Sequence, residues 1–357
     1  MTDLLNKVHP GFKLNNVSYS FEELKEVAYS LVKEGTPFEI SLGDFLLDWL
    51  SGSEILEVRT SGSTGSPKLI RLRRKQMINS ARATGNFLAL SPGDSALLCL
   101  PMEYIAGKMM LVRAMVLGLE LHYKIPSSTP LEQGNQEYNF GAMTPMQLKN
   151  SISQIERIRK LIVGGSAVPE DLREELTLKK NQIYESFGMT ETITHIALKK
   201  LSRGASEEHF KTLDNVRVTI DKRNCLVIEA PDINAEKIVT NDLVSLHSET
   251  EFKWLGRIDN MVNSGGIKLS PEQIEEKIKN CINTRFFVTG LPDEVLGEHL
   301  VLILEGEKDI KTIRECIGRL KQLEKFEIPK KIFCIPAFVL TKSGKIKRSE
   351  TRALVQQ

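Results

Sequence analysis

The chain has 357 residues, of which 41% are hydrophobic, enough for two cored domains, so the composition excludes an intrinsically disordered protein. Its 48 lysines and arginines against 46 aspartates and glutamates leave a formal net charge of +2, which disfavours a nucleic-acid or membrane-surface protein. The start lacks an apolar signal core and no run approaches the ~18 apolar residues of a membrane span, so we expect a cytoplasmic protein. The five cysteines show no metal-ligand spacing and predict reduced, mostly buried thiols.

Helical and strand-like patterns alternate along the first part of the chain. Ser20 and Glu23 form a capping-box pattern that opens an amphipathic helix, and Thr144-Pro145 opens another. Further helices are expected at 74–88 and 105–117, and strands at 55–59, 96–100, 119–123, 139–143 and 161–163. This alternation predicts an α/β fold with several parallel strands, whose ligands gather beyond the carboxyl ends of those strands.

The pattern changes in the last third of the chain. Short alternating segments predict a β-rich subdomain over 211–256, and the polar stretch 257–266 reads as a hinge. The remainder predicts a small α+β unit, in which Ser270 to Gln273 form a capping box with proline at the first helical position. We therefore expect a large N-terminal domain of mixed and parallel sheets over 1–256 and a mobile C-terminal domain over 267–357.

A glycine-rich loop lies between two strand-like segments, with the sequence Thr60-Ser61-Gly62-Ser63-Thr64-Gly65-Ser66-Pro67-Lys68. Its glycines let the backbone approach a polyanion, while the hydroxyls and Lys68 add donors. It is not a Walker A loop, because Ser66-Pro67 separates Gly65 from Lys68 and a strand follows. We predict a phosphate-binding loop, and the alternative is a polar hairpin tip without a ligand.

Five further segments follow this loop, and the six together stand in the order found in one superfamily. They are Gly164-Gly165-Ser166, Tyr184 to Glu191, Thr240 to Leu243, Gly256 to Pro271, and Leu340 to Arg348. With these motifs the chain resembles the acyl-adenylate-forming (AMP-dependent synthetase/ligase) superfamily of acyl-CoA synthetases, luciferases and peptide-synthetase adenylation domains. The resemblance implies an AMP-forming acid–thiol ligase that uses ATP, Mg²⁺ and CoA.

The resemblance also implies where the nucleotide binds. The loop from Thr60 to Lys68 would enclose the departing phosphates, Thr190 would bond a phosphate oxygen, and Glu191 would place the Mg²⁺. Adenine would lie against Phe187 and Gly188 and against the residues Gly164, Gly165 and Ser166. A plain helix start for Thr190-Glu191 and core packing for Phe187 are the alternatives.

Three positions near the C-terminal domain complete the implied machinery. Asp242 resembles the ribose ligand and Arg257 its assistant, while Asp259 resembles the hinge residue, with a surface-turn aspartate as the alternative. Asn241 stands where the superfamily has glycine, which we expect to be tolerated because asparagine visits left-handed backbone conformations at modest cost.

The C-terminal domain would act in both steps of the reaction. Lys345 resembles the lysine that reaches the reacting carboxylate and α-phosphate, and a solvated basic tail is its alternative. Gly265 and Gly266 would line the channel for the pantetheine arm of CoA, where side chains obstruct.

A resemblance to one group of ligases within the superfamily implies the substrate. Much of the superfamily's N-terminal portion is absent before the loop, which suggests a compact ligase for a small acid. Pro101 to Gly107 before a methionine-rich helix look like the bacterial o-succinylbenzoate–CoA ligases of menaquinone synthesis. Lys108 or Arg113 would then anchor the second carboxylate, and Tyr104 or the methionines would flank the ring.

Other functions stay open at this stage. The acid partner could be another short aliphatic or aryl acid, the acceptor could be a carrier protein, or the chain could be a non-catalytic AMP- or ATP-binding protein. The retained Thr190, Glu191, Asp242, Arg257 and Lys345 count against the last of these. The sequence leaves the oligomeric state open, with a homodimer among the options.

Overall fold

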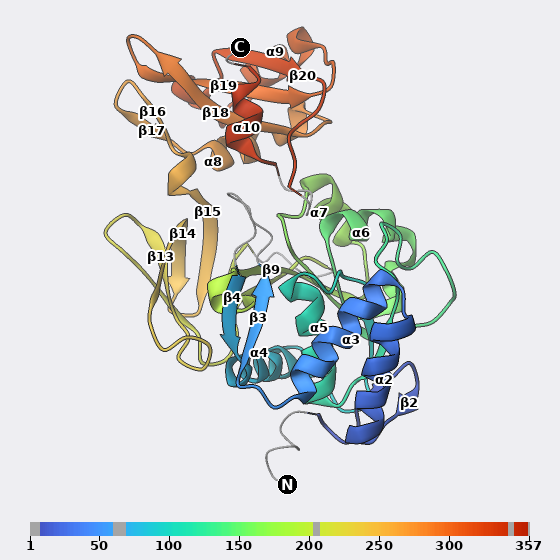
Figure 1. Ribbon diagram of the computed structural model, residues 1–357. Coiled ribbons are helices and arrows are strands. Elements are labelled where there is room, and N and C mark those ends of the chain that lie inside the picture. Colours follow the sequence, from blue (N-terminus) through green and yellow to red (C-terminus); the bar gives the residue numbers. More distant parts are fainter. Residues whose placement is uncertain (1–7, 60–68, 203–207, 342–345, 356–357) are drawn as a thin grey trace. The chain divides into compact units, whose positions relative to one another are not determined.

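A computed structural model describes residues 8–59, 69–202, 208–341 and 346–355 (Figure 1). The chain forms two compact units. The first holds the described residues up to Arg217 together with Ile228–Ile238, and the second holds Val218–Val227 and the chain from Val239 onward. The predicted domain limits at 256 and 267 therefore stay predictions.

A largely parallel sheet forms the core of the first unit. Its strands are neighbours in the order β11-β10-β9-β8-β7-β5-β6-β1-β2, and β9, β8, β7, β5, β6 and β1 run parallel to one another. This confirms the predicted α/β fold. The strand bounds are β1 (Lys13–Leu14), β2 (Val17–Ser18), β5 (Ser95–Leu98), β6 (Glu120–Tyr123), β7 (Tyr138–Met143), β8 (Ile158–Val163), β9 (Gln182–Gly188), β10 (His195–Lys200) and β11 (Phe210–Thr212).

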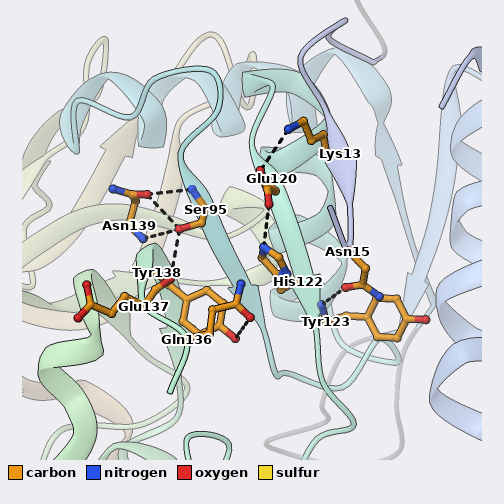
Figure 2. Close-up of polar contacts among 10 residues, drawn as sticks. All are labelled: Lys13, Asn15, Ser95, Glu120, His122, Tyr123, Gln136, Glu137, Tyr138 and Asn139. Carbon is orange, nitrogen blue, oxygen red and sulfur yellow. Dashed lines mark hydrogen bonds and ion pairs between the residues drawn. The ribbon is translucent and has the colours of Figure 1, made fainter. Parts of the chain in front are cut away.

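Polar pairs fix the amino ends of these parallel strands (Figure 2). The backbone N–H of Ser95 donates to Asn139 Oδ1 at 3.0 Å, and the N–H of Asn139 donates to Ser95 Oγ at 3.1 Å. Beside them, Glu120 contacts Lys13 at 3.5 Å and His122 at 3.3 Å. These side chains lie at the amino ends of the strands. Ligands of α/β sheets bind at the opposite, carboxyl ends.

Helices cover the sheet, and their starts follow the predicted caps. The predicted capping box at Ser20–Glu23 is present, Thr144 is the N-cap of its helix with Pro145 at the first position, and Thr36–Glu39 form a further capping box that was not predicted. Helix α2 packs against α3, and α4 packs against α5. The bounds are α2 (Phe21–Glu34), α3 (Pro37–Leu50), α4 (Arg74–Phe87), α5 (Ile105–Leu117), α6 (Pro145–Asn150), η1 (Ile152–Arg157), α7 (Glu170–Leu176) and η2 (Thr190–Thr192).

An antiparallel pair flanks the glycine-rich loop. Strands β3 (Ile55–Arg59) and β4 (Leu69–Arg73) pair with Arg59 opposite Leu69. Strand-like sequence on both sides of the loop is thus confirmed, while Thr60 to Lys68 themselves lie outside the described residues.

The second unit contains most of a run of four strands and a smaller, separate sheet. Strands β12 (Arg217–Ile220), β13 (Cys225–Glu229), β14 (Ile238–Ser248) and β15 (Glu251–Arg257) are neighbours in chain order and form the predicted β-rich part. The smaller sheet has the order β17-β16-β19-β18, with β20 paired to β19. Its bounds, with those of the short helices, are η3 (Ile258–Asn260), β16 (Val262–Ser264), β17 (Ile267–Leu269), α8 (Pro271–Ile278), η4 (Lys279–Cys281), β18 (Phe286–Asp293), β19 (Gly297–Glu305), α9 (Ile310–Gly318), η5 (Lys325–Glu327), β20 (Lys331–Ile335) and α10 (Arg348–Ala353).

Two expectations for this unit are wrong. Ser270 precedes α8, but its hydroxyl donates to the carbonyl of Leu255 at 3.2 Å and caps no helical N–H, so the capping box is absent. Cys281 and Cys316 form a disulfide, with sulfurs 2.04 Å apart, because folding brings η4 beside α9 across 35 residues of sequence. The thiols of Cys99 and Cys225 are free and buried as expected, whereas that of Cys334 is only half-buried. Among the described residues, every helix is too short or too polar to cross a membrane.

Candidate active site

The carboxyl ends of β8 and β9 bring two predicted adenine-binding segments together. These strands are parallel, with Val163 opposite Glu185, so Gly164 to Ser166 emerge beside the residues that end β9. A side chain at Gly164 would place its Cβ 2.3 Å from Ser186 Oγ, and that hydroxyl donates to the Val163 carbonyl at 3.0 Å. A residue larger than glycine at 164 would therefore displace the Ser186 hydroxyl from its bond to Val163.

Phe187 and Gly188 end strand β9. The half-buried Phe187 ring has its centroid 5.7 Å from that of Phe210 on β11, so it has an aromatic partner within the protein. A Cβ at Gly188 would lie 2.1 Å from the carbonyl oxygen of Thr194, which shows that the backbone folds back tightly at this point. This turn carries the chain directly to Thr190 and Glu191.

Thr190 and Glu191 lie on η2, and their neighbour Thr192 fixes the turn. The Thr192 hydroxyl lies 2.9 Å from the Met189 carbonyl and 2.6 Å from that of Thr194, and it accepts from the Met189 N–H at 2.9 Å. Ile193 follows with φ of +67°, a strained conformation for a β-branched residue that costs about 1–3 kcal/mol. Such strain persists where the surrounding structure holds a functional segment.

Glu191 has the chemistry of a magnesium ligand that acts together with phosphates. Its side chain is exposed, and no cluster of three or more metal-ligating side chains occurs in the described ranges. Mg²⁺ usually keeps several waters and takes one or two carboxylates plus substrate phosphates. A single carboxylate beside the predicted phosphate site would therefore fit this ion.

Glu185 is a buried carboxylate that the sequence analysis did not single out. It contacts Arg173 Nη2 at 2.7 and 2.8 Å and Lys199 Nζ at 2.9 Å, and it accepts the backbone N–H of Val168 at 3.0 Å. Burial raises the pKa of Glu185, but the two cations and the N–H outweigh burial and hold it below its ordinary value. The bond to Val168 anchors the segment after Gly164–Ser166. A glutamate within an apolar strand was the available signal.

Arg113 on α5 is a buried cation of a different kind. Its side chain donates to Thr84 Oγ1 at 3.3 Å and to Thr194 Oγ1 at 3.1 Å, and Nη1 lies 3.9 Å from the sulfur of Met110. In the described part of the chain no carboxylate is in ion-pair contact with it. Burial lowers the pKa of Arg113 to about 10, so it is charged at neutral pH.

His195 completes the surroundings of Arg113. Its ring is buried, and Nε2 lies 3.3 Å from Thr84 Oγ1. Burial and the nearby guanidinium lower the pKa of His195 well below its ordinary value, so the ring is neutral. Through Thr194, this cluster is joined to the segment that carries Thr190 and Glu191.

The other predicted acid-binding residues lie nearer the start of α5. Tyr104 is the N-cap of the helix, and the Lys108 ammonium lies 5.3 Å from the ring centroid of Phe45 on α3. The structure thus directs Lys108 toward α3 and Arg113 toward α4. The methionines of the helix are fully buried and belong to the core, namely Met109, Met110 and Met115.

In the second unit, the predicted ribose carboxylate is already oriented. Asp242 is buried on β14, where Oδ1 accepts from Trp254 Nε1 at 3.0 Å and lies 3.8 Å from Arg257. Trp254 was not predicted, and its place on the strand paired with β14 explains the contact. Arg257 also contacts Asp259 at 2.6 Å. The predicted ribose and hinge residues are therefore linked through Arg257.

Gly265 and Gly266 form the turn of the β16–β17 hairpin. Both have positive φ, +60° and +83°, which favours glycine. The N–H of Gly265 donates to the carbonyl of Leu296 at 2.8 Å, and a side chain at Gly266 would meet nothing within 4 Å. Lys345 lies outside the described residues.

Comparisons with known proteins identify the family and the fold. The family model described as "AMP-binding enzyme" matches residues 59–221. A 2-succinylbenzoate–CoA ligase of Staphylococcus epidermidis is 24% identical over 325 residues, which cover 82% of this chain and 68% of that protein.

Two solved structures are also similar. An acyl-CoA synthetase (AMP-forming)/AMP-acid ligase II-like protein from Dyadobacter fermentans is 36% identical, with a TM-score of 0.62 and coverage of 93% of this chain and 98% of that one. The o-succinylbenzoate coenzyme A synthetase of Bacillus subtilis in complex with ATP and magnesium ion is 19% identical, with a TM-score of 0.70 and coverage of 94% and 82%. The latter likeness concerns the fold.

Proposed function

The chain belongs to the family of AMP-binding enzymes and is an AMP-forming acid–CoA ligase, and from this premise we propose that it activates a small aromatic dicarboxylate of the o-succinylbenzoate type. One observation carries the proposal of a second carboxylate. Arg113 is a buried guanidinium whose described partners are two hydroxyls and a thioether. A buried charge without a counter-ion is costly, and a bound carboxylate would supply one.

The position of Arg113 supports an anchoring role. Its partner Thr194 follows directly after the η2 segment that carries Thr190 and Glu191, and the same hydroxyl lies 3.3 Å from Ser80 Oγ. An anion bound at Arg113 would therefore lie near the segment proposed to bind phosphate. The Staphylococcus epidermidis relative bears the name of a 2-succinylbenzoate–CoA ligase, which favours this acid over other aromatic ones.

In the first step, a carboxylate oxygen of the acid attacks the α-phosphorus of ATP and pyrophosphate leaves. Thr190 would bond a phosphate oxygen, while Phe187 and Gly164–Ser166 would hold the adenine. Mg²⁺ would neutralise phosphate charge at Glu191. Lys345 would stabilise the charge that develops between the carboxylate and the α-phosphate, where one such group contributes on the order of 3 kcal/mol.

In the second step, the thiol of CoA loses its proton, the sulfur attacks the acyl carbon, and AMP leaves. We propose that Asp259 is the hinge for the change between the steps and that Gly265 and Gly266 line the pantetheine channel. The carboxylate of Asp242 would accept hydrogen bonds from the ribose hydroxyls in both steps, since Trp254 and Arg257 already orient it.

The test is the formation of CoA thioester and AMP from ATP, Mg²⁺ and CoA. Parallel reactions would contain o-succinylbenzoate, benzoate, a medium-chain fatty acid or no acid. We expect strong turnover with o-succinylbenzoate alone. Turnover with benzoate at a similar rate would refute the second-carboxylate proposal, and thioester formation only on a carrier protein would refute CoA as the acceptor.

A further inference from the structure

Both polar side-chain atoms of Asn241, Nδ2 and Oδ1, take part in hydrogen bonds. Its Nδ2 donates to Asp259 Oδ1 at 2.9 Å, and its Oδ1 accepts from Arg223 Nη1 at 3.0 Å. Since a guanidinium can only donate, Arg223 fixes which end of the amide faces Asp259. Asparagine is tolerated at this position without a left-handed backbone, because the residue lies within the extended strand β14 and is not among the residues with positive φ. Its side chain, and not its backbone freedom, distinguishes it from glycine.

Arg223 is itself held in place by the turn between β12 and β13. Its Nε donates to Asp221 Oδ2 at 2.8 Å, and its Nη2 donates to the carbonyl of Thr240 at 3.1 Å. Asp221 in turn accepts the backbone N–H groups of Arg223 and Cys225 at 2.7 and 3.0 Å. The amide of Asn241 is therefore supported by a built turn and by the residue that precedes it on the strand.

Both oxygens of Asp259 are engaged. Oδ1 accepts from Asn241, and Oδ2 accepts from Arg257 Nη2 at 2.6 Å. The hydrogen bond from Arg257, followed by that from Asn241, lowers the pKa of Asp259 below its ordinary value, so the carboxylate is ionised at neutral pH. Both of these bonds are charge-assisted, which makes them stronger than neutral ones.

The next residue bonds in a different direction. Asn260 Nδ2 donates to Glu272 Oε1, and Glu272 lies in the first turn of α8. Successive residues of η3 are thus attached to different elements, Asp259 to β14 and β15 and Asn260 to α8. A rotation about the N–Cα bond of Asp259 would carry its side chain along with the following chain, and would therefore break the bonds to β14 and β15.

We propose that Asn241 is a positioning residue that latches the carboxylate of Asp259 to strand β14 and so governs how readily the hinge turns between the two half-reactions. The proposal rests on the proposed function, from which the hinge role of Asp259 comes. Glycine, which the superfamily has at this position, could make neither bond. Loss of one partly exposed, charge-assisted bond should change the rate of the hinge motion about threefold to tenfold.

Three variants test the latch. Asn241→Gly removes both bonds, and Asn241→Asp keeps the size but places a second carboxylate beside Asp259. Lys222→Ala is the matched control, because Lys222 is an exposed cation in the same turn as Arg223. Melting temperatures are measured first to show that all variants fold.

The first readout needs no substrate. Hydrogen exchange at the amides of residues 258–262 should be at least threefold faster in both Asn241 variants than in the wild type and in Lys222→Ala. Unchanged exchange in both variants would overturn the latch. If the wild-type protein formed no acyl-AMP from any acid, the proposed function would fail, and this readout would still decide the latch.

The second readout tests whether Asn241 affects the two half-reactions differently or only makes residues 258–262 more mobile. Adenylate formation is followed by pyrophosphate release, and thioester formation is followed with supplied acyl-AMP and CoA. Both Asn241 variants should change the ratio of the two rates about threefold or more in the same direction, with the KM for ATP unchanged because Asp242 is intact. Faster exchange with a ratio equal to that of the wild type would overturn the positioning role.

Discussion

Among the buried charges of the first unit, Arg113 and Glu185 are surrounded in opposite ways. Glu185 meets two cations, Arg173 and Lys199, and also a backbone N–H. Arg113 meets hydroxyls, a thioether and a neutral ring, and no carboxylate among the described residues. Both side chains are nearly inaccessible to solvent.

This difference separates a structural charge from a functional one. A buried ion must be compensated, since the effective cost of desolvation is several kcal/mol. The fold itself compensates Glu185, so its effect should appear in stability. We propose that a bound ligand compensates Arg113, so its effect should appear in substrate selection. The comparison would fail if loss of Arg113 lowered stability and spared substrate selection, or if loss of Glu185 did the reverse.

The largest effect is expected for Arg113→Met. Loss of the guanidinium would leave a substrate carboxylate buried without a partner, a cost of about 4 kcal/mol or about 10³-fold in kcat/KM for o-succinylbenzoate. Folding stability should be unchanged or higher by about 1 kcal/mol, because a desolvated charge is gone. Kinetics with o-succinylbenzoate and urea unfolding measure the two quantities.

Lys75→Met provides the control for this change, since it removes an exposed cation from the neighbouring helix α4. It should leave both quantities near the wild-type values. If Arg113→Met lost stability and kept its kcat/KM, Arg113 would be a structural charge like Glu185, and the comparison would fail.

Glu185→Gln should act mainly on stability. It removes the charge that compensates two cations, and breaking such a buried network costs about 3 kcal/mol. Chemical denaturation would measure the loss, and Glu174→Gln, on the exposed face of α7, should cost less than about 0.5 kcal/mol. A stable Glu185→Gln protein with lost activity would instead give Glu185 a role in the reaction.

Local sequence patterns were sufficient to predict much of the fold and the order of the motif segments along the chain. Alternating strands and helices, with caps such as Ser20–Glu23, indicated the parallel sheet. These features depend on neighbours in sequence or on a periodicity that burial imposes. The same is true of the hairpin around the predicted phosphate loop.

Contacts between distant segments could not be predicted in this way. Glu185 pairs with residues from α7 and β10, and Cys281 pairs with Cys316 from another helix. The chemistry of each side chain was visible, but its partner is fixed only when the elements pack. Asn241 is an intermediate case, since its departure from the superfamily's glycine marked the position, while its contact with Asp259 required the structure.

Acid should remove the contribution of Glu185 but not that of Arg113. The pKa of Glu185 is below its ordinary value of 4.5 in the folded state, so its stabilisation is complete above pH 4.5 and declines as the pH falls through the lowered pKa. The stability difference between the wild type and Glu185→Gln should therefore shrink below pH 4.5, by up to about 1.4 kcal/mol per pH unit. Arg113 stays protonated throughout this range, so any pH dependence of the difference between the wild type and Arg113→Met should come from His195, whose pKa the guanidinium lowers. Urea titrations from pH 3 to pH 7 would check both.

The smallest effect is expected at Thr84, whose hydroxyl serves Arg113 and His195 together. Its single proton goes to the Ser80 carbonyl at 2.9 Å, so its oxygen must accept from Arg113 Nε and from His195 Nε2, each at 3.3 Å. This places the proton of the neutral His195 ring on Nε2. Thr84→Val would leave both donors buried without their acceptor and should cost about 1 kcal/mol of stability and about fivefold in kcat/KM for o-succinylbenzoate. Thr84→Ser keeps the oxygen and should lose less than half as much. A loss in Thr84→Ser with little loss in Thr84→Val would assign the effect to packing of the methyl group, and the orientation of Arg113 would then rest on Thr194.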